Sequence, residues 1–185
     1  MNVARFARVP YLSLRYALIG RVGESGQLPH GWNGEHLSDI EVVDVNSPGE
    51  PWLTLDLGFR ENMPGDYAGL CVGAYLEASK GSVVTLTGEV ALAEHSNIEA
   101  AYMIIREWEP GGRLITQSTQ PLAVSEGAQV AFVSHTVAGH ERVMQPMFMI
   151  KRQGVAPGRL SLTLRGLAVG DAEDHPEWLQ SVLDG

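Results

Sequence analysis

Apolar side chains recur at every second position through most of this chain, in short runs that end at glycine- or proline-rich turns. Between residues 52 and 59, for example, leucines at 53, 55 and 57 and Phe59 alternate with Trp52, Thr54 and Asp56. A period of two is that of a β-strand with one buried face. No run between turn signals keeps the 3.6-residue period of a helix across the central region. The pattern therefore predicts an all-β chain.

The segment 99–119 is the clearest local unit, because it reads as two strands joined by the turn Glu-Pro-Gly-Gly at 109–112. Pro110 suits an early turn position, and Gly111 and Gly112 are expected to supply positive φ angles. The predicted hairpin places Arg106 and Trp108 beside this turn.

Eight to ten short strands with turns at regular intervals predict a two-sheet antiparallel β-sandwich, most simply a jelly roll. Further strands are expected at 40–45, 70–78, 83–93, 129–137, 144–152 and 159–169. Residues 1–170 would form this single domain, with an early strand near Tyr11 and Tyr16. Residues 171–185 would form a helix or a junction to a neighbouring domain, because Asp174 and Glu177 resemble a capping box with Pro176 in the first turn.

Charge and hydropathy exclude several functional classes. The net charge is -9 and there is no basic stripe, which argues against nucleic-acid binding. No run approaches the ~20 apolar residues of a membrane span, and no signal-peptide core is evident. Localisation is therefore left open between the cytoplasm and a larger assembly. The single cysteine, Cys71, rules out an intrachain disulfide and is expected to be a buried, inert thiol.

No pattern of catalytic or metal-ligating residues emerges. The six histidines form no His-x-His or His-x-x-x-His pair, so neither a metal nor any other cofactor is predicted. No spacing selects a pair of carboxylates for glycoside hydrolysis, and no nucleophile elbow supports a Ser-His-Asp site. The glycines at 20, 23 and 26 lack the strand–turn–helix context of a phosphate loop. An enzyme on a jelly-roll fold is therefore a weaker hypothesis than the two non-catalytic functions considered next.

Several segments together resemble jelly-roll carbohydrate-binding modules and related galactose-binding-like domains. The matching segments are Gly-Arg-Val-Gly-Glu-Ser-Gly-Gln-Leu-Pro-His-Gly-Trp at 20–32, Trp-Leu-Thr-Leu-Asp-Leu-Gly at 52–58, residues 75–90, and the closing pair at 145–151 and 158–164. The resemblance implies a non-catalytic module that binds oligo- or polysaccharide. The chain lacks the usual Asn-rich first strand. It also lacks the Asp-rich last strand that helps to hold a structural calcium in many such domains, so a calcium ion is not expected here. A structural or protein-interaction module, phage-like or part of a surface assembly, is the alternative.

Sugar recognition needs a flat aromatic face together with planar polar groups. The candidate ligand-binding residues are Trp52, Asp56, Tyr75, Tyr102, Arg106 and Trp108. Trp52 and Tyr102 could instead be core residues, since both faces of the first hairpin strand are apolar. Trp32 is expected to close one end of the core.

Overall fold

The structure is a computed structural model that describes residues 32–45, 52–59, 66–72, 76–124, 127–154 and 156–170, and it contains the predicted hairpin. Strand β7 (Ile98–Trp108) runs into the turn and β8 (Leu114–Leu122) returns beside it. The turn is closed by the Gly112 amide donating to the Glu109 carbonyl and the Glu109 amide donating to that of Arg113, at 2.8 and 2.9 Å. Gly112 has the expected positive φ of 84°. Gly111 does not, so that part of the prediction is wrong.

The hairpin belongs to the first of two antiparallel sheets, which we call sheet A. Its strand order is β1-β4-β10-β7-β8, and β5 pairs separately with β10. The remaining strands of sheet A are β1 (Asn33–Glu35), β4 (Tyr67–Cys71), β5 (Leu76–Ala78) and β10 (Arg142–Arg152). Among the strands that the structure describes, β8 therefore forms one edge of sheet A.

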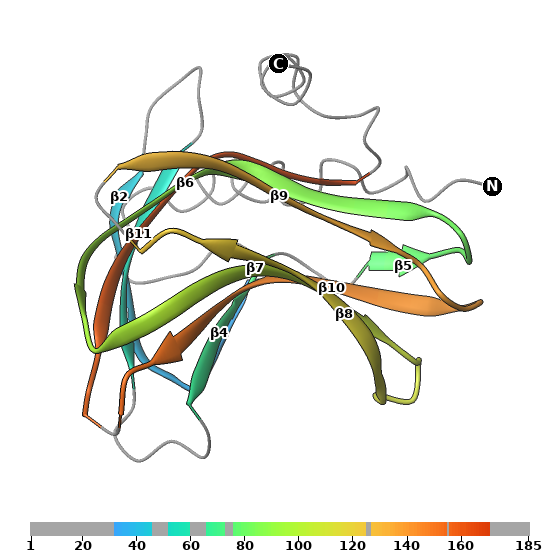
Figure 1. The fold of residues 1–185 in the computed structure, drawn as a ribbon, viewed down its shortest axis with the longest axis horizontal. Helices are drawn as coiled ribbons and strands as arrows, with labels where there is room; N and C mark the ends of the chain where they lie inside the picture. The colour runs from blue at the N-terminus through green and yellow to red at the C-terminus, as the bar shows by residue number, and fades with distance from the viewer. Residues whose placement is uncertain are drawn as a thin grey trace.

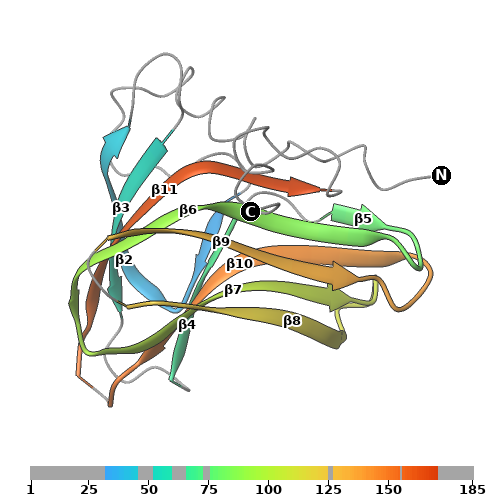
Figure 2. The same cartoon turned by 45° about the horizontal axis from the view of Figure 1, so that its top comes forward.

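The second sheet, sheet B, has the order β2-β3-β11-β6-β9. Its strands are β2 (Leu37–Val45), β3 (Trp52–Phe59), β6 (Val83–Ser96), β9 (Ala128–Thr136) and β11 (Arg159–Gly170). Figures 1 and 2 show the two sheets stacked face to face, with β9 lying over the hairpin of sheet A. The edge strands β8 and β9 are in contact, so they mark the same side of the sandwich.

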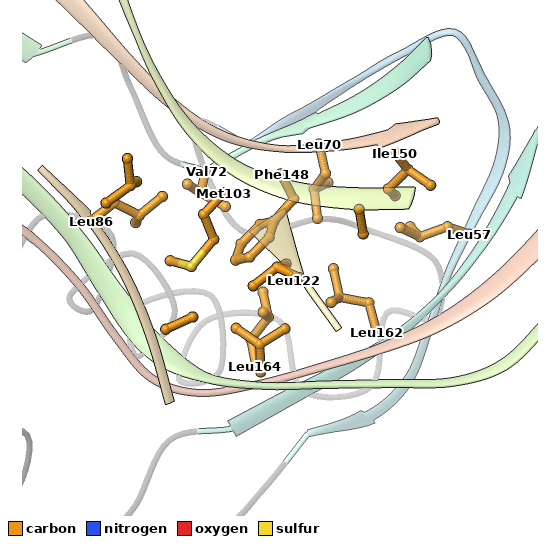
Figure 3. Packing of buried hydrophobic residues seen from close by; sticks show 14 of the residues in the cluster. Leu57, Leu70, Val72, Leu86, Met103, Leu122, Phe148, Ile150, Leu162 and Leu164 are labelled. Carbon is orange, nitrogen blue, oxygen red and sulfur yellow. The ribbon is translucent and has the colours of Figure 1, made fainter. Parts of the chain in front are cut away.

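The core fills the space between the sheets with the alternating apolar side chains (Figure 3). Sheet A contributes Leu70, Met103 and Phe148, and sheet B contributes Leu162 and Leu164; all five are at most 1% exposed. Burying a side chain of this size contributes roughly 1.5–3 kcal/mol. The sandwich thus follows from the period-two pattern, because one face of every long strand must be removed from water.

The prediction of an all-β, two-sheet jelly-roll sandwich is confirmed. The strand at 52–59 has the predicted limits, and Trp32 lies in the core. The predicted strand 70–78 is instead two strands, β4 and β5, with 73–75 outside the described residues. The early strand near Tyr11 and the terminal helix also fall outside the described residues. Within the described ranges, no helix is long and apolar enough to cross a membrane.

Candidate functional site

Strand β7 has side chains on both faces of sheet A: one set packs into the core, and the other lies on the outside of the sheet. Met103 and Ile105 point into the core between the sheets. The alternate residues Tyr102, Arg106 and Trp108 point the other way and are half-buried. The sequence grouped these three residues because they occupy alternate positions of one strand. The structure places them together on the outside of the sheet.

Strand pairing extends this face across the neighbouring strands. Tyr102 lies opposite Met149 and Arg106 lies opposite Gln145 on β10, while Met149 lies opposite Gly69 on β4. We call the resulting surface the outer face of sheet A. It comprises Glu35, Tyr67, Gly69, Cys71, Tyr102, Ile104, Arg106, Trp108, Gln145, Met147, Met149 and Lys151.

The floor of this face is apolar and closely packed. Cys71, Ile104 and Met147 are at most 2% exposed although they point away from the core, and Tyr102 and Met149 pack against them. A Cβ atom at Gly69 would overlap the terminal methyl of Met147, so glycine leaves the room that this methionine occupies. The face is thus a second small hydrophobic cluster bordered by polar and aromatic side chains.

A hydrogen-bonded polar network crosses the apolar floor. The indole Nε1 of Trp108 donates to Oε1 of Gln145 at 3.0 Å, and Nε2 of Gln145 donates to Oε1 of Glu35 at 3.4 Å. The other carboxylate oxygen of Glu35 accepts from Nη1 of Arg106, also at 3.4 Å. The guanidinium further donates to the sulfur of Met149 at 3.8 Å. An aromatic ring, a cation and an anion are therefore held side by side.

One end of the face carries an exposed tyrosine and a lysine. Tyr67 is 42% exposed and lies opposite Lys151 across the β4–β10 pair. Lys151 forms an ion pair with Glu99 that raises the lysine pKa, and the nearby Tyr67 and Tyr102 add to this effect. Tyr67 and Tyr102 thus lie beyond one end of the polar network, and Trp108 forms its other end.

The six sequence-predicted ligand residues do not share one surface. Tyr102, Arg106 and Trp108 meet on the outer face of sheet A. Asp56 is half-buried on the outer face of sheet B, opposite Ser161, because Leu55 and Leu57 beside it fill the core. Trp52 begins β3 in the same sheet B, and nothing is described of its side chain. Tyr75 lies outside the described residues.

Glu35, Tyr67 and Gln145 lie on the outer face of sheet A but were not among the candidate residues predicted from the sequence. Tyr67 shares its parity with Cys71, and a strand starting at 67 rather than 70 would have revealed it. Gln145 falls between the apolar residues Val143 and Met147 in the alternating series of its own strand, which marks a polar residue on an otherwise apolar face. Glu35 carries no such signal, because its place depends on pairing with β4.

Cys71 is a protonated thiol at neutral pH. Burial, followed by the charge of Glu35, raises its pKa to about 12, and its Sγ lies 3.7 Å from Oε1 of Glu35. The thiolate is the reactive form, so this cysteine is inert in the folded chain. The sequence-based prediction of a buried thiol is confirmed, although the residue lies in the outer cluster rather than between the sheets.

A second polar cluster lies between the sheets, beneath Arg106 and Trp108. Glu107 points inward from β7 and is completely buried. Its carboxylate accepts from His135 Nε2 at 2.9 Å and from the amides of Ala138 and Gly139 at 2.9 and 3.2 Å. Nε of Arg142 also lies 3.2 Å from this carboxylate. The buried charge is therefore surrounded by donors, as a buried carboxylate requires.

The other imidazole nitrogen of this cluster reaches a serine. Ser118 Oγ on β8 lies 3.0 Å from Nδ1 of His135. An ionised Glu107 can only accept, so a neutral His135 carries its proton on Nε2 and accepts from Ser118 at Nδ1. The order hydroxyl, imidazole and carboxylate is that of an activated nucleophile. Ser118 nevertheless lies within a regular paired strand, not at the sharp turn that exposes a nucleophile.

Among the residues that the structure describes, no three His, Cys, Asp or Glu side chains are grouped to hold a metal ion.

No family model and no curated protein matches the chain in sequence. In structure the chain resembles β-sandwich carbohydrate-binding modules. One such structure, described as carbohydrate-binding modules of the β-sandwich superfamily, has 10% identity and a TM-score of 0.49 over 77% of this chain and 58% of that one. The N-terminal cellulose-binding domain of Cellulomonas fimi β-1,4-glucanase C has 10% identity and a TM-score of 0.43 over 81% and 95%.

A phage protein also matches. The enzymatically active domain of tailspike protein 4 from bacteriophage CBA120 has 12% identity and a TM-score of 0.46 over 76% of this chain and 19% of that one. The chain therefore spans less than two thirds of this protein and of the superfamily structure above. Strand pairing within this chain, rather than these distant likenesses, defines its fold.

Proposed function

We propose that this chain is a non-catalytic carbohydrate-binding β-sandwich module that binds oligo- or polysaccharide through the outer face of sheet A. The observation that carries the proposal is the network of Trp108, Gln145, Glu35 and Arg106 lying over an apolar floor. The network joins aromatic, donor and acceptor groups from strands β7, β10 and β1 on one face of sheet A.

These groups match the chemistry of a sugar ring. A pyranose offers a C–H face that packs on an aromatic ring and a rim of hydroxyls that need both donors and acceptors. Arg106 supplies donors and Glu35 supplies acceptors next to each other, and Glu35 is 39% exposed. Tyr67 and Tyr102 extend the aromatic surface along the sheet. A chain of several sugar units would thus meet alternating stacking and hydrogen-bonding positions.

The opposite outer face provides a matched control for this proposal. Soluble β-linked glucan, xylan and galactan oligosaccharides would be titrated into the chain by calorimetry, after a glycan array has chosen among them. W108A should weaken binding at least tenfold, whereas D56A, on the outer face of sheet B, should leave it unchanged. No saturable binding to any glycan, or equal binding by W108A, would refute the proposal.

A second candidate function, contact with protein, is favoured by a different surface. Val130 and Phe132 lie on the outside of the edge strand β9 and are 37% and 46% exposed. Exposed apolar side chains on an unpaired edge favour association between chains. If this edge joins two copies of the chain, sedimentation should show concentration-dependent dimers that F132S abolishes. A monomer at all concentrations would remove this candidate.

A further inference from the structure

Gln145 is a polar side chain buried within the outer face of sheet A. It lies near the middle of β10, opposite Arg106 on β7, and only 4% of it is exposed. A buried carboxamide costs free energy unless its donors and acceptor are bonded. A glutamine at this position is therefore explained by the hydrogen-bonding groups that its side chain connects.

The carboxamide of Gln145 connects three other strands. Its Oε1 accepts from Nε1 of Trp108 on β7 at 3.0 Å. Its Nε2 donates to Sγ of Cys71 on β4 at 3.0 Å and to Oε1 of Glu35 on β1 at 3.4 Å. One side chain thus bridges the strands that carry the aromatic and acidic groups of the face.

The chemistry of these partners fixes the orientation of the amide. An indole N–H only donates, so it must meet the amide oxygen. An ionised carboxylate only accepts, so Glu35 must meet the amide nitrogen. Both assignments point the amide the same way, and the second oxygen of Glu35 is then left to accept from Arg106. The orientation of the Trp108 ring is thereby linked through Gln145 and Glu35 to the position of the guanidinium.

We propose that Gln145 is the positioning residue of this face, holding Trp108 and the Glu35–Arg106 pair in one arrangement before a ligand arrives. The inference rests on the proposed function, because its benefit is a ready-made binding surface. Ordering mobile side chains on binding weakens affinity, and a network already formed avoids that cost. Releasing Trp108 and Glu35 should therefore weaken sugar binding about tenfold.

The test needs three variants. Q145L removes every bond of the amide. Q145E keeps an acceptor for Trp108 but places a second carboxylate against Glu35. Adding E35Q to Q145E restores a donor–acceptor pair with the roles exchanged, because position 35 now donates and position 145 accepts. The amide oxygen at position 35 can still accept from Arg106. The thermal midpoint of each variant shows whether the fold survives.

The first readout needs no ligand. The indole N–H signal of Trp108, assigned with W108F, should exchange with solvent at least tenfold faster in Q145L than in the native chain. The second readout is the dissociation constant for the oligosaccharide that binds the native chain. Affinity should fall about tenfold in Q145L and Q145E and recover in the double variant.

The outcomes separate this inference from the proposed function. Unchanged indole exchange in a folded Q145L overturns the positioning role, whether or not a sugar binds. Native affinity in folded Q145L, or no recovery in the double variant, overturns it as well while leaving sugar binding intact. Faster exchange in Q145L, with no glycan bound by the native chain, would support the positioning of Trp108 and refute only the proposed function.

Discussion

His135 of sheet B and Glu107 of sheet A are joined by a hydrogen bond of 2.9 Å across the interior of the sandwich. The contact links the edge strand β9 to the strand that presents Arg106 and Trp108. Packing of apolar side chains holds the sheets together over most of their area. At this end, a buried hydrogen bond to the Glu107 carboxylate also joins the two sheets.

Acid should weaken the contact between His135 and Glu107 and so lower the stability of the fold. Burial acts to raise the pKa of Glu107, but hydrogen bonds from His135, Ala138 and Gly139 outweigh burial and lower it below 4.5. A carboxyl with a lowered pKa in the folded state contributes stability above its unfolded value, and this contribution is lost as pH falls through the folded value. Urea unfolding should therefore show stability falling below about pH 4.

The variant E107Q should lower the free energy of unfolding by about 2 kcal/mol at pH 7, because it removes the charge that accepts hydrogen bonds from His135 and two backbone amides. Its remaining stability should depend less on pH between 5 and 2 than that of the native chain. If E107Q and the native chain lose stability in parallel over this range, the proposed contribution of Glu107 is wrong.

Ser118 should be unreactive despite its bond to His135. It lies half-buried in the middle of the regular strand β8, and no strained turn presents its hydroxyl. A fluorophosphonate probe should leave the folded chain unlabelled, as judged by intact mass. S118A should cost only about 1 kcal/mol, the usual worth of one hydrogen bond. Stoichiometric labelling that S118A abolishes would instead identify an active serine.

The two turn glycines should respond differently to alanine. Gly112 has a φ of 84°, where a side chain costs about 1 kcal/mol or more, so G112A should lower stability by that amount. Gly111 is outside the positive-φ region, and a Cβ atom added to it would meet open space. G111A should therefore be neutral or slightly stabilising by denaturant unfolding. Equal losses in both variants would contradict the described turn.

The thiol of Cys71 should resist alkylation. Its pKa of about 12 leaves almost no thiolate at pH 8, and the side chain is buried. Iodoacetamide should modify the native chain very slowly and the urea-unfolded chain at the normal rate. Rapid modification of the native chain at pH 8 would show that the outer face of sheet A is open at this residue.

Local pattern was enough to predict the sandwich and much of its strand order along the chain. The alternation of Leu53, Leu55 and Leu57 gives β3 its limits, and the Glu-Pro-Gly-Gly turn gives the hairpin. Alternation also shows which residues of one strand share a face. Tyr102, Arg106 and Trp108 were grouped correctly for that reason.

Long-range pairing could not be predicted from the same pattern. Parity does not say which sheet a strand joins, so Asp56 was grouped with residues that lie across the sandwich from it. Gln145 and Glu35 are 110 positions apart, and no local signal brings them together. The turn at 111 and 112 was also ambiguous, because glycine tolerates positive φ but does not require it.

The most direct test of the central claim uses the methionine methyl groups as reporters of the two faces. Met147 and Met149 lie on the outer face of sheet A, while Met103 and Met144 lie in the core. Methyl NMR spectra would be recorded during titration with the oligosaccharide that the chain was found to bind. The account predicts that Met149, and to a lesser degree Met147, shifts saturably while Met103 and Met144 hold their positions. Saturable binding that leaves Met147 and Met149 unshifted would contradict it.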